Sequence, residues 1–327
     1  MRKIIDECFF QIQNGANIKQ GKVDGGFPIT RIETIANDRF NRDRMGYAGI
    51  TDLSKYESYI LEDEDLLMSH INSMQYLGRT VLYKKQDDEI IIHGMNLLRL
   101  RANRDIIIPG YAKYYFYGHS FRSQLRNIMK KSVNQASFAV KDLKKIKMEI
   151  PCLREQQKLV QVLDKIQKII DVKTKEIAKF DELVSARFFE MFGDPITNSK
   201  LLPIEKIEER YFLKAGITTK AEDIHDYLKD KYEIPCYGGN GIRGYVENLS
   251  YEGCYPIIGR QGALCGNVQY ATGKFHATEH AVLVSILKND NTMWVYYMLK
   301  LMDLYRYHTG AAQPGLAVKK LNTIDVI

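Results

Sequence analysis

The stretch from Pro151 to Pro195 constrains the fold more than any other part of the chain. Apolar residues recur in it at heptad spacing, in two interleaved series. The members of this seam are Leu159, Leu163, Ile166, Ile170, Ile177, Phe180, Val184 and Met191. Such a pattern predicts a long helix that packs lengthwise against another helix as a coiled coil.

The boundaries of this helix are marked in the sequence. Pro151 suits a first helical turn, and Gly193 followed by Pro195 supplies a C-terminal stop. About forty residues at roughly 1.5 Å each would give a helix about 60 Å long, which favours a spacer between two domains. The alternative is an amphipathic helix lying on its own domain, and Lys173 and Arg187 within the second series favour that alternative.

The bulk composition is that of a globular protein with two domains. The chain has 327 residues, of which 45% are hydrophobic and 27% charged. It has no run of about 18 apolar residues and no signal-peptide core, so we expect a cytoplasmic protein without membrane contact. Its five cysteines form no CxxC pair, which argues against disulfides and a zinc ribbon. The net charge of +7 fits a polyanionic partner.

Two blocks of mixed helix and strand flank the long helix, at residues 1–150 and 196–327. The first has strand-like runs in FPITRIETI, YAGITD, DLLMSHI, RTVLYKK and EIIIHGMNLLRLRA, and a helical KYYFYGHSFRSQLRNIMKK. The second has EIPCYGG, YPIIGRQGA, GNVQYA and HAVLVSI, followed by a helical NTMWVYYMLKLMDLYRY. The predicted fold class is therefore α+β, with mainly antiparallel sheets plus helices in each block.

The two blocks also read as an internal repeat. Residues 135–146 (QASFAVKDLKKI) align with residues 313–324 (QPGLAVKKLNTI) at an offset of 313 − 135 = 178. The openings IIDECFFQIQNG and IEKIEERYFLKAG are similar as well. The repeated unit is a block plus a helix, and 151 + 178 = 329 falls just past residue 327. We therefore expect a helix from another chain to cover the exposed seam.

Two motifs resemble sites found in enzymes but have simpler structural interpretations. The glycines of 239–244 (GNGIRG) match a nucleotide-binding loop, but no helix follows them, and tight turns between strands explain them better. His276 and His280 share one face of an expected strand end, where recognition is favoured over the alternative of a metal site. The chain has no GxSxG elbow, Walker loop or amino-methyltransferase motif, so we expect no catalytic residues and no metal of its own.

Side chains that can read DNA bases are concentrated in turn-like segments of both blocks. Arginine pairs with guanine and phosphate, and asparagine and glutamine pair with adenine. The alternative for any one residue is a solvated turn, and Tyr111, Tyr114, Tyr115 and Tyr117 are interpreted as core. The candidates for DNA binding are Arg31, Asn37, Arg39, Asn41, Arg42, Arg44, Ser69, His70, Asn72, Tyr237, Asn240, Arg243, Arg260, Gln261, His276, Thr278 and His280.

Several stretches resemble the DNA-specificity subunit of type I restriction-modification systems (HsdS). MEIPCLREQQKLVQVLDKI and FFEMFGDP are similar to the start and end of that family's conserved helix. NQASFAVKDLKKIKMEIP and GAAQPGLAVKKLNTIDVI resemble its recurrent domain ending. CYGGNGIRGYVE and PIIGRQGALCGNVQY resemble segments of its recognition domains.

The resemblance implies two target-recognition domains, 1–150 and 196–327, joined by the helix 151–195. Each domain would read one half of a bipartite site in double-stranded DNA, and the helix would set the gap and dock methyltransferase subunits. Restriction/translocase subunits would join them, and S-adenosylmethionine, ATP and Mg would belong to these partners rather than to this chain. The chain departs from the family pattern by ending before a second conserved helix. That helix is either lost by truncation or supplied by another polypeptide, including a second copy of this one, and a silent specificity cassette would look the same.

Two rival functions make different predictions. A stand-alone nuclease or methyltransferase would be active with a metal or a methyl donor. A regulatory coiled-coil protein would bind DNA weakly and without steep salt dependence.

Overall fold

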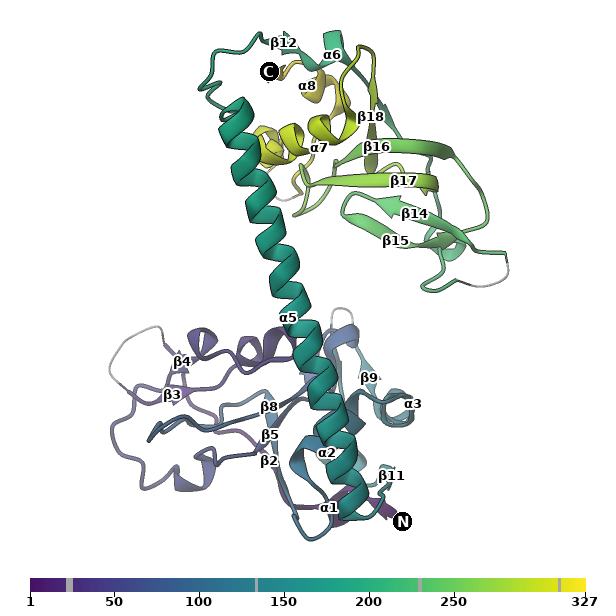
Figure 1. Cartoon of the computed structure of the whole chain (residues 1–327). Coiled ribbons are helices and arrows are strands. Elements are labelled where there is room, and N and C mark those ends of the chain that lie inside the picture. Colours follow the sequence, from purple (N-terminus) through teal and green to yellow (C-terminus); the bar gives the residue numbers. More distant parts are fainter. Residues whose placement is uncertain (22–25, 133–134, 229–230, 311–312) are drawn as a thin grey trace. The chain divides into compact units, whose positions relative to one another are not determined.

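The computed structural model describes residues 1–21, 26–132, 135–228, 231–310 and 313–327. Asn134, Ala311 and Ala312, which belong to the two repeated endings, lie outside the described residues. The chain divides into two compact units, Met1–Lys173 and Thr174–Ile327. The division falls within the long helix α5 (Leu153–Phe192), which therefore contributes to both units (Figure 1).

Unit 1 is built on an antiparallel sheet whose strand order, in the described residues, is β2-β8-β5-β7. Its strands are β2 (Phe9–Asn14), β5 (Leu66–Ser69), β7 (Thr80–Leu82) and β8 (Leu97–Ala102). Helices α2 (Pro109–Tyr117) and α3 (His119–Ile128) pack on one face through Ala112, Phe116, Phe121 and Leu125. A second apolar cluster, which includes Ile35 and Leu61, covers the opposite face.

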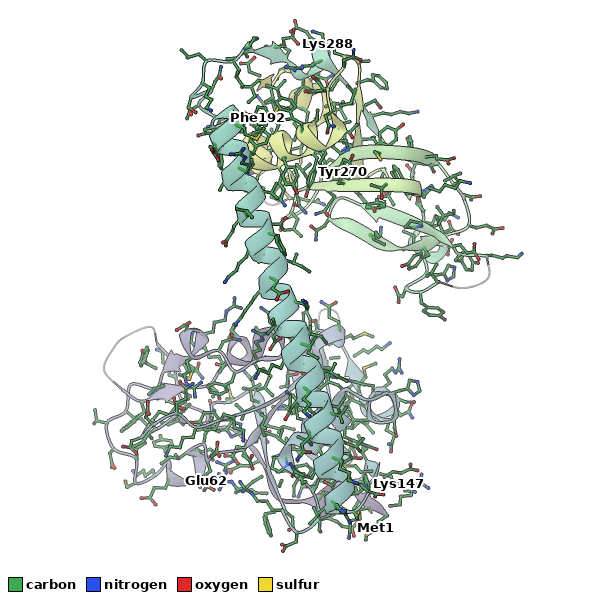
Figure 2. The ribbon with its side chains drawn as sticks, in the orientation of Figure 1. Met1, Glu62, Lys147, Phe192, Tyr270 and Lys288 are labelled. Atoms are coloured by element: carbon green, nitrogen blue, oxygen red, sulfur yellow. The ribbon has the colours of Figure 1, made fainter. Side chains whose placement is uncertain are left out.

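Short elements complete unit 1. They are β1 (Arg2–Ile4), α1 (Ile5–Cys8), β3 (Pro28–Ile29), the 3-10 helices η1 (Ile32–Asp38), η2 (Arg42–Arg44), η3 (Glu57–Tyr59) and η4 (Met74–Tyr76), β4 (Gly46–Tyr47), β6 (Ile71–Asn72), β9 (Lys130–Lys131), β10 (Ala136–Ser137), α4 (Val140–Leu143) and β11 (Lys147–Glu149). The first and last strands of the unit, β1 and β11, pair antiparallel, so Met1 and Lys147 lie on the same side of the unit (Figure 2).

Unit 2 contains a larger sheet with the order β13-β18-β16-β17-β14-β15 in the described residues, antiparallel except for the parallel pair β14 and β17. Its strands are β13 (Tyr211–Ala215), β14 (Ile234–Gly238), β15 (Gly241–Val246), β16 (Tyr251–Gly259), β17 (Val268–Ala277) and β18 (Ala281–Ile286). Helix α7 (Thr292–Leu301) packs on one face through Val295, Met298 and Leu299. The other elements are β12 (Glu205–Lys206), α6 (Ile207–Arg210), η5 (Ala221–Asp223), η6 (Leu304–Tyr307), α8 (Val318–Asn322) and β19 (Asp325–Val326).

The structure confirms the internal repeat. Unit 1 runs β1-α1-β2 and ends α4-β11, and unit 2 runs β12-α6-β13 and ends α8-β19. The N–H of Ile5 donates to the Ile146 carbonyl at 2.9 Å, and the N–H of Ile207 donates to the Ile324 carbonyl at 3.0 Å. The two acceptors are again separated by 324 − 146 = 178 residues. In both units, therefore, an equivalent backbone hydrogen bond joins the first segment of the unit to its last segment.

The start of α5 is fixed by Gln156, which is fully buried. Its side-chain nitrogen donates to the carbonyls of Ile106 and Pro151 at 2.9 and 3.0 Å, and its side-chain oxygen accepts from the N–H of Ile108 at 2.8 Å. A buried amide with all these partners locks the helix start to the loop before α2. These contacts account for the first glutamine of the Ile-Pro-x-x-x-x-Gln-Gln sequence at residues 150–157.

The seam predicted from the heptads lies on α5, and within each unit it is largely exposed. Ile166, Ile177 and Phe180 are 47%, 63% and 66% exposed. Leu159, Ile170, Val184 and Met191 are exposed as well, and Leu163 is half-buried. Near the C-terminal end, Phe188 is buried and Phe192 packs edge-on against Trp294 of unit 2, with ring centroids 5.8 Å apart.

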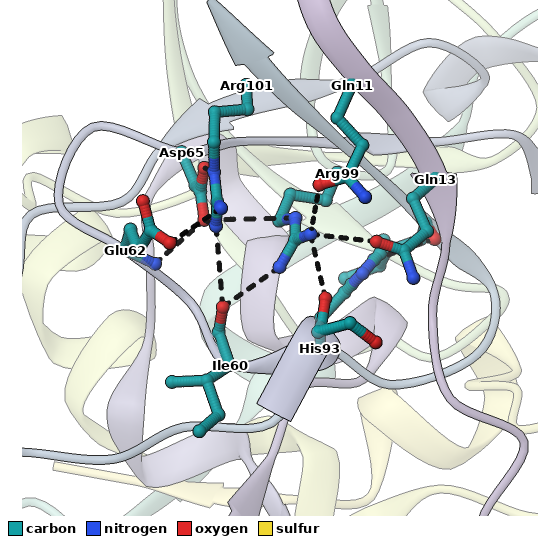
Figure 3. Close-up of polar contacts among 10 residues, drawn as sticks. Gln11, Gln13, Ile60, Glu62, Asp65, His93, Arg99 and Arg101 are labelled. Carbon is teal, nitrogen blue, oxygen red and sulfur yellow. Dashed lines mark hydrogen bonds and ion pairs between the residues drawn. The ribbon is translucent and has the colours of Figure 1, made fainter. Parts of the chain in front are cut away.

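A buried arginine holds the edge of the unit 1 sheet together (Figure 3). The guanidinium of Arg99 is fully buried and donates to the Ile60 carbonyl at 2.9 Å. It also donates to the side-chain oxygens of Gln11 and Gln13 at 2.6 and 2.8 Å. These bonds fasten the loop before β5 across β8 and β2.

The strand predictions hold better in unit 2 than in unit 1. FPITRIETI contributes only the two residues of β3, because its second half turns into η1. The Thr34 hydroxyl accepts from the N–H of Arg31 at 2.8 Å and the Thr34 N–H donates back to the Arg31 carbonyl at 3.1 Å, which closes a turn instead of extending a strand. IIDECFFQIQNG likewise divides into the one-turn α1 and the strand β2.

Candidate nucleic-acid interface

The loop between β5 and β7 brings three unit 1 candidates together. Ser69 is buried, and its hydroxyl donates to the Tyr76 carbonyl at 2.6 Å. His70 is half-buried beside the Phe138 ring, and burial lowers the pKa of its imidazole. Asn72 is partly exposed and accepts from the N–H of Ser73 at 2.8 Å. The loop thus presents Asn72 and the exposed turn of η4 at the surface.

Arginines that sequence reasoning did not select border this loop. Met74, Gln75, Leu77, Leu125 and Met129 line a hollow of about 460 Å³, together with Arg122 and Arg126. Arg122 donates to the Leu77 carbonyl at 2.6 Å, and the guanidinium of Arg79 lies 4.2 Å from the centre of the Tyr76 ring. Spacing of four residues places Arg122 and Arg126 on one face of α3, a signal that the sequence does contain.

The segment 31–44 meets the same region through Asp38. The Asp38 carboxylate accepts from Arg79 at 3.0 Å and from the Tyr117 hydroxyl at 2.7 Å. Its neighbours Asn37 and Arg39 are exposed, and Arg39 forms an ion pair with Asp171 of α5 at 2.6 Å. Arg44 is exposed too. Asn37, Arg39 and Arg44 are therefore accessible to a partner.

Other candidates in this segment serve the structure of unit 1. Arg31 donates to the side chain of Gln20 at 2.7 Å and to the Gly21 carbonyl at 3.2 Å. Asn41 donates to the Ala36 carbonyl at 2.7 Å. Arg42 donates twice to Glu89, at 2.5 and 2.9 Å, and this pairing lowers the pKa of Glu89 to about 2.

In unit 2, three turns converge on a hollow of about 470 Å³. The β14–β15 turn supplies Asn240, strand β15 supplies Arg243, the β16–β17 loop supplies Gln261 and Leu264, and His280 lies between β17 and β18. Asn240, Arg243 and Gln261 are exposed, and His280 is close to Glu279 at 3.2 Å. Four predicted residues, the first and last of which are 280 − 240 = 40 positions apart in the chain, therefore line one surface.

The glycines of 239–244 lie in a β-hairpin, as expected for a tight turn. Gly238 pairs with Gly241, and β15 rather than a helix follows. A Cβ atom on Gly259 would meet the Gly239 carbonyl oxygen at 2.1 Å, so these two loops approach closely. The hairpin is therefore packed directly against the end of β16.

The remaining unit 2 candidates lie below this surface. Thr278 is fully buried, and His276 is 5% exposed, with its ring nitrogens contacting the hydroxyls of Ser250 and Thr219. Burial also lowers the pKa of His276. Tyr237 is half-buried edge-on to Phe275, with ring centroids 5.5 Å apart. Arg260 is half-buried at the base of the β16–β17 loop.

Two of the four tyrosines of α2 contribute to core packing, as the sequence indicated, whereas Tyr117 is 37% exposed. Tyr111 and Tyr115 pack against the core cluster of unit 1. The Tyr114 hydroxyl donates to Asp164 of α5 at 2.6 Å, and the Tyr117 hydroxyl donates to Asp38. No helix in the described part of the chain is long and apolar enough to cross a membrane.

Comparison with known proteins gives one consistent result. A match to the family described as "Type I restriction modification DNA specificity domain" covers residues 7–181. The chain is 36% identical over 236 residues to the type I restriction enzyme EcoprrI specificity subunit of Escherichia coli, covering 65% of this chain and 56% of that protein. It is 32% identical over 198 residues to the putative type I restriction enzyme MjaX specificity subunit of Methanocaldococcus jannaschii, covering 61% and 46%.

The fold has a solved counterpart. The crystal structure of the type I restriction-modification system S subunit from M. genitalium matches with a TM-score of 0.52 at 15% identity, covering 100% of this chain and 83% of that one. The chain spans about half the length of the curated relatives that it matches.

Proposed function

Because this chain belongs to the type I restriction modification DNA specificity domain family, we propose that it recognises DNA sequence without catalysing a reaction itself. Each unit reads one half of a bipartite site in double-stranded DNA. The resemblance that the sequence alone carried is confirmed at the level of the family.

One observation supports this proposal most strongly. In each unit an equivalent pair of antiparallel strands is joined by a loop that contains predicted base-contacting residues. The loops are β5–β7 in unit 1 and β16–β17 in unit 2. Amide side chains such as Asn72 and Gln261 match the adenine edge. Arg243 of β15, which lines the same hollow as Gln261, matches guanine or phosphate. Arg122 and Arg126 beside the first loop supply positive charge that neutralises phosphates.

The partners follow from the kind of protein to which this chain is related. We expect methyltransferase subunits and restriction/translocase subunits to bind it and to carry S-adenosylmethionine, ATP and Mg. The domain arrangement that we propose is recognition domains at 1–150 and 196–327 on the helix 151–195, with the length of the helix setting the gap between half-sites.

The exposed seam of α5 is a contact surface in this proposal. Ile177 and Phe180 are the kind of apolar side chains that a helix presents to a partner helix rather than to water. We propose that a second helix covers the seam, supplied by another polypeptide, which includes a second copy of this chain.

DNA selection tests the function directly. The full chain, alone and co-purified with a candidate methyltransferase subunit, is incubated with random duplexes, and the bound sequences are enriched over several rounds. We expect a two-part site with a fixed gap and an affinity that falls steeply with salt. Weak binding without enrichment, with and without the methyltransferase subunit, would refute the proposal.

A further inference from the structure

We propose that both units hold their recognition loop on the same backbone frame, with Phe138 and Leu316 as positioning residues, and that the loop tips determine which bases are preferred. The tips are residues 71–77 in unit 1 and 261–265 in unit 2. This inference rests on the proposed DNA recognition and goes beyond it. It distinguishes the residues that hold each loop in place from the residues that contact the DNA bases.

The first part of the frame is the base of each hairpin. In unit 1 the N–H of Gly78 donates to the Ser69 carbonyl at 2.8 Å, and the N–H of Ser69 donates to the Arg79 carbonyl at 2.9 Å. In unit 2 the N–H of Gly266 donates to the Gly259 carbonyl at 2.7 Å, and the N–H of Gly259 donates to the Asn267 carbonyl at 2.8 Å. The two bases have the same pattern of hydrogen bonds.

Each loop is closed by a glycine in the left-handed region. Gly78 has a φ of 73° and Gly266 has a φ of 84°. The surroundings also exclude a side chain, because a Cβ atom would meet the Leu125 side chain at 2.5 Å in the first case and the Tyr305 backbone at 2.4 Å in the second. Only glycine satisfies both requirements without strain.

The second part of the frame is the internal repeat itself. The N–H of Phe138 donates to the His70 carbonyl at 3.2 Å, and the N–H of Leu316 donates to the Arg260 carbonyl at 2.8 Å. One residue earlier, Ser137 pairs with Ile71 and Gly315 pairs with Gln261. The offset is again 316 − 138 = 178, so the best-matched stretch of the two repeats contacts the first residues of both loops.

The side chains of the positioning residues are anchored in the core. Phe138 is 3% exposed and Leu316 is 1% exposed. The Phe138 ring also lies edge-on to His70, with ring centroids 6.4 Å apart. Because the side chains of Phe138 and Leu316 are buried, their backbone N–H groups are held in place. Each N–H group therefore fixes the position at which its loop leaves the sheet.

Between these fixed points the two loops differ in sequence and length. Unit 1 has HINSMQYL over residues 70–77, and unit 2 has RQGALC over residues 260–265. Both tips expose large side chains, with Met74 at 53% and Leu264 at 55%. An apolar side chain of this kind contacts the thymine methyl group in a major groove, and Gln75 and Gln261 beside them offer amides for adenine.

The loops are also stiff enough to read bases without first folding. The Tyr76 carbonyl is bound by the Ser69 hydroxyl, and the Leu77 carbonyl is bound by Arg122, each at 2.6 Å. In unit 2 the N–H groups of Cys265 and Asn267 donate to the Gly262 and Leu264 carbonyls at 3.0 and 3.2 Å. Preformed loops lose less conformational entropy on binding.

Tip and frame variants of the full chain test the inference on the duplex that the unmodified chain enriches. We expect Gln75→Ala or Met74→Ala to change the preferred bases in one half-site by about tenfold in relative affinity and to leave the other half-site unchanged. Gln261→Ala or Leu264→Ala should change only the other half. Glu57→Ala, on the exposed surface of η3, is the matched control.

The frame is tested with the residue that the other repeat carries. Phe138→Leu should retain the preference for the first half-site, whereas Phe138→Ala should reduce discrimination there about tenfold at a temperature where circular dichroism shows both variants folded. Equal discrimination in Phe138→Ala and the unmodified chain would remove the positioning role. Unchanged preferences in all four tip variants would overturn the inference while leaving DNA recognition intact, whereas the absence of enrichment by the unmodified chain would refute the proposed function.

Discussion

At the scale of single residues, substitutions of buried polar side chains have the effects on stability that are simplest to measure. Replacing Arg99 by Ala would leave the side-chain oxygens of Gln11 and Gln13 and the Ser58 carbonyl without this donor. We expect unit 1 to lose about 3–5 kcal/mol of unfolding free energy. Arg104→Ala, which removes an exposed ion pair with Glu64, should cost less than about 1 kcal/mol.

The single tryptophan of the chain, Trp294, gives this experiment an internal reference. Its fluorescence reports urea unfolding of unit 2, and hydrogen exchange of unit 1 amides reports unit 1. We expect Arg99→Ala to increase exchange in unit 1 and to leave the tryptophan transition in place. An Arg99→Ala chain with the exchange rates of Arg104→Ala would contradict this account of the network.

His93 makes the stability of unit 1 depend on pH. It is fully buried beside Arg99, and burial lowers the pKa of its imidazole from 6.5 to about 3. Below pH 6.5 the unfolded chain binds a proton that the folded chain does not accept until about pH 3, so stability falls as the pH falls. When the pH is lowered from 6.5 to 5, the unfolding free energy of both chains falls. We expect it to fall by up to about 2 kcal/mol less in His93→Gln than in the unmodified chain. Parallel pH profiles in the two chains would contradict the prediction.

At the scale of elements, α5 combines a fixed start with an exposed seam. Phe180→Ser combined with Ile177→Ser changes seam side chains that are 66% and 63% exposed, so it should leave the fold of unit 2 intact. Self-association through the seam should weaken at least tenfold, as measured by sedimentation across a concentration series. Glu182→Ser, on a different face of the helix, is the control. Identical sedimentation of the double variant and the parent chain would argue against self-association by this route.

The elements also differ in how far sequence alone could predict them. The bounds of α5 were predictable because Pro151, Gly193 and the heptads are local signals. The β3–η1 segment was not, because the Thr34 hydroxyl closes a turn in a stretch that is otherwise rich in strand-forming residues. Candidates such as Asn72 and Gln261 could be selected by type. The structural equivalence of the two loops that contain them could not be predicted, because it depends on backbone hydrogen bonds between segments that are distant in the sequence.

At the scale of the whole molecule, the proposed ruler predicts how an insertion in α5 acts. Seven added residues between Lys175 and Glu176 lengthen the helix by about 10 Å and rotate its far end by only about 20°. We expect the gap between half-sites to change by about three base pairs while both half-site sequences stay the same, measured by selection on random duplexes. An unchanged gap would show that α5 does not set the spacing.

The pairing of first and last strands in unit 1 has a consequence for how the chain is made. Strand β1 is synthesised before the rest of unit 1, and its partner β11 ends only at Glu149. Until that point has been synthesised, Ile5, Cys8 and Phe9 cannot complete the core that they later occupy. Folding of unit 1 is therefore a late event on the nascent chain, governed by a contact between its two ends, and the emerging segment is most exposed to chaperones and proteases before α5 begins.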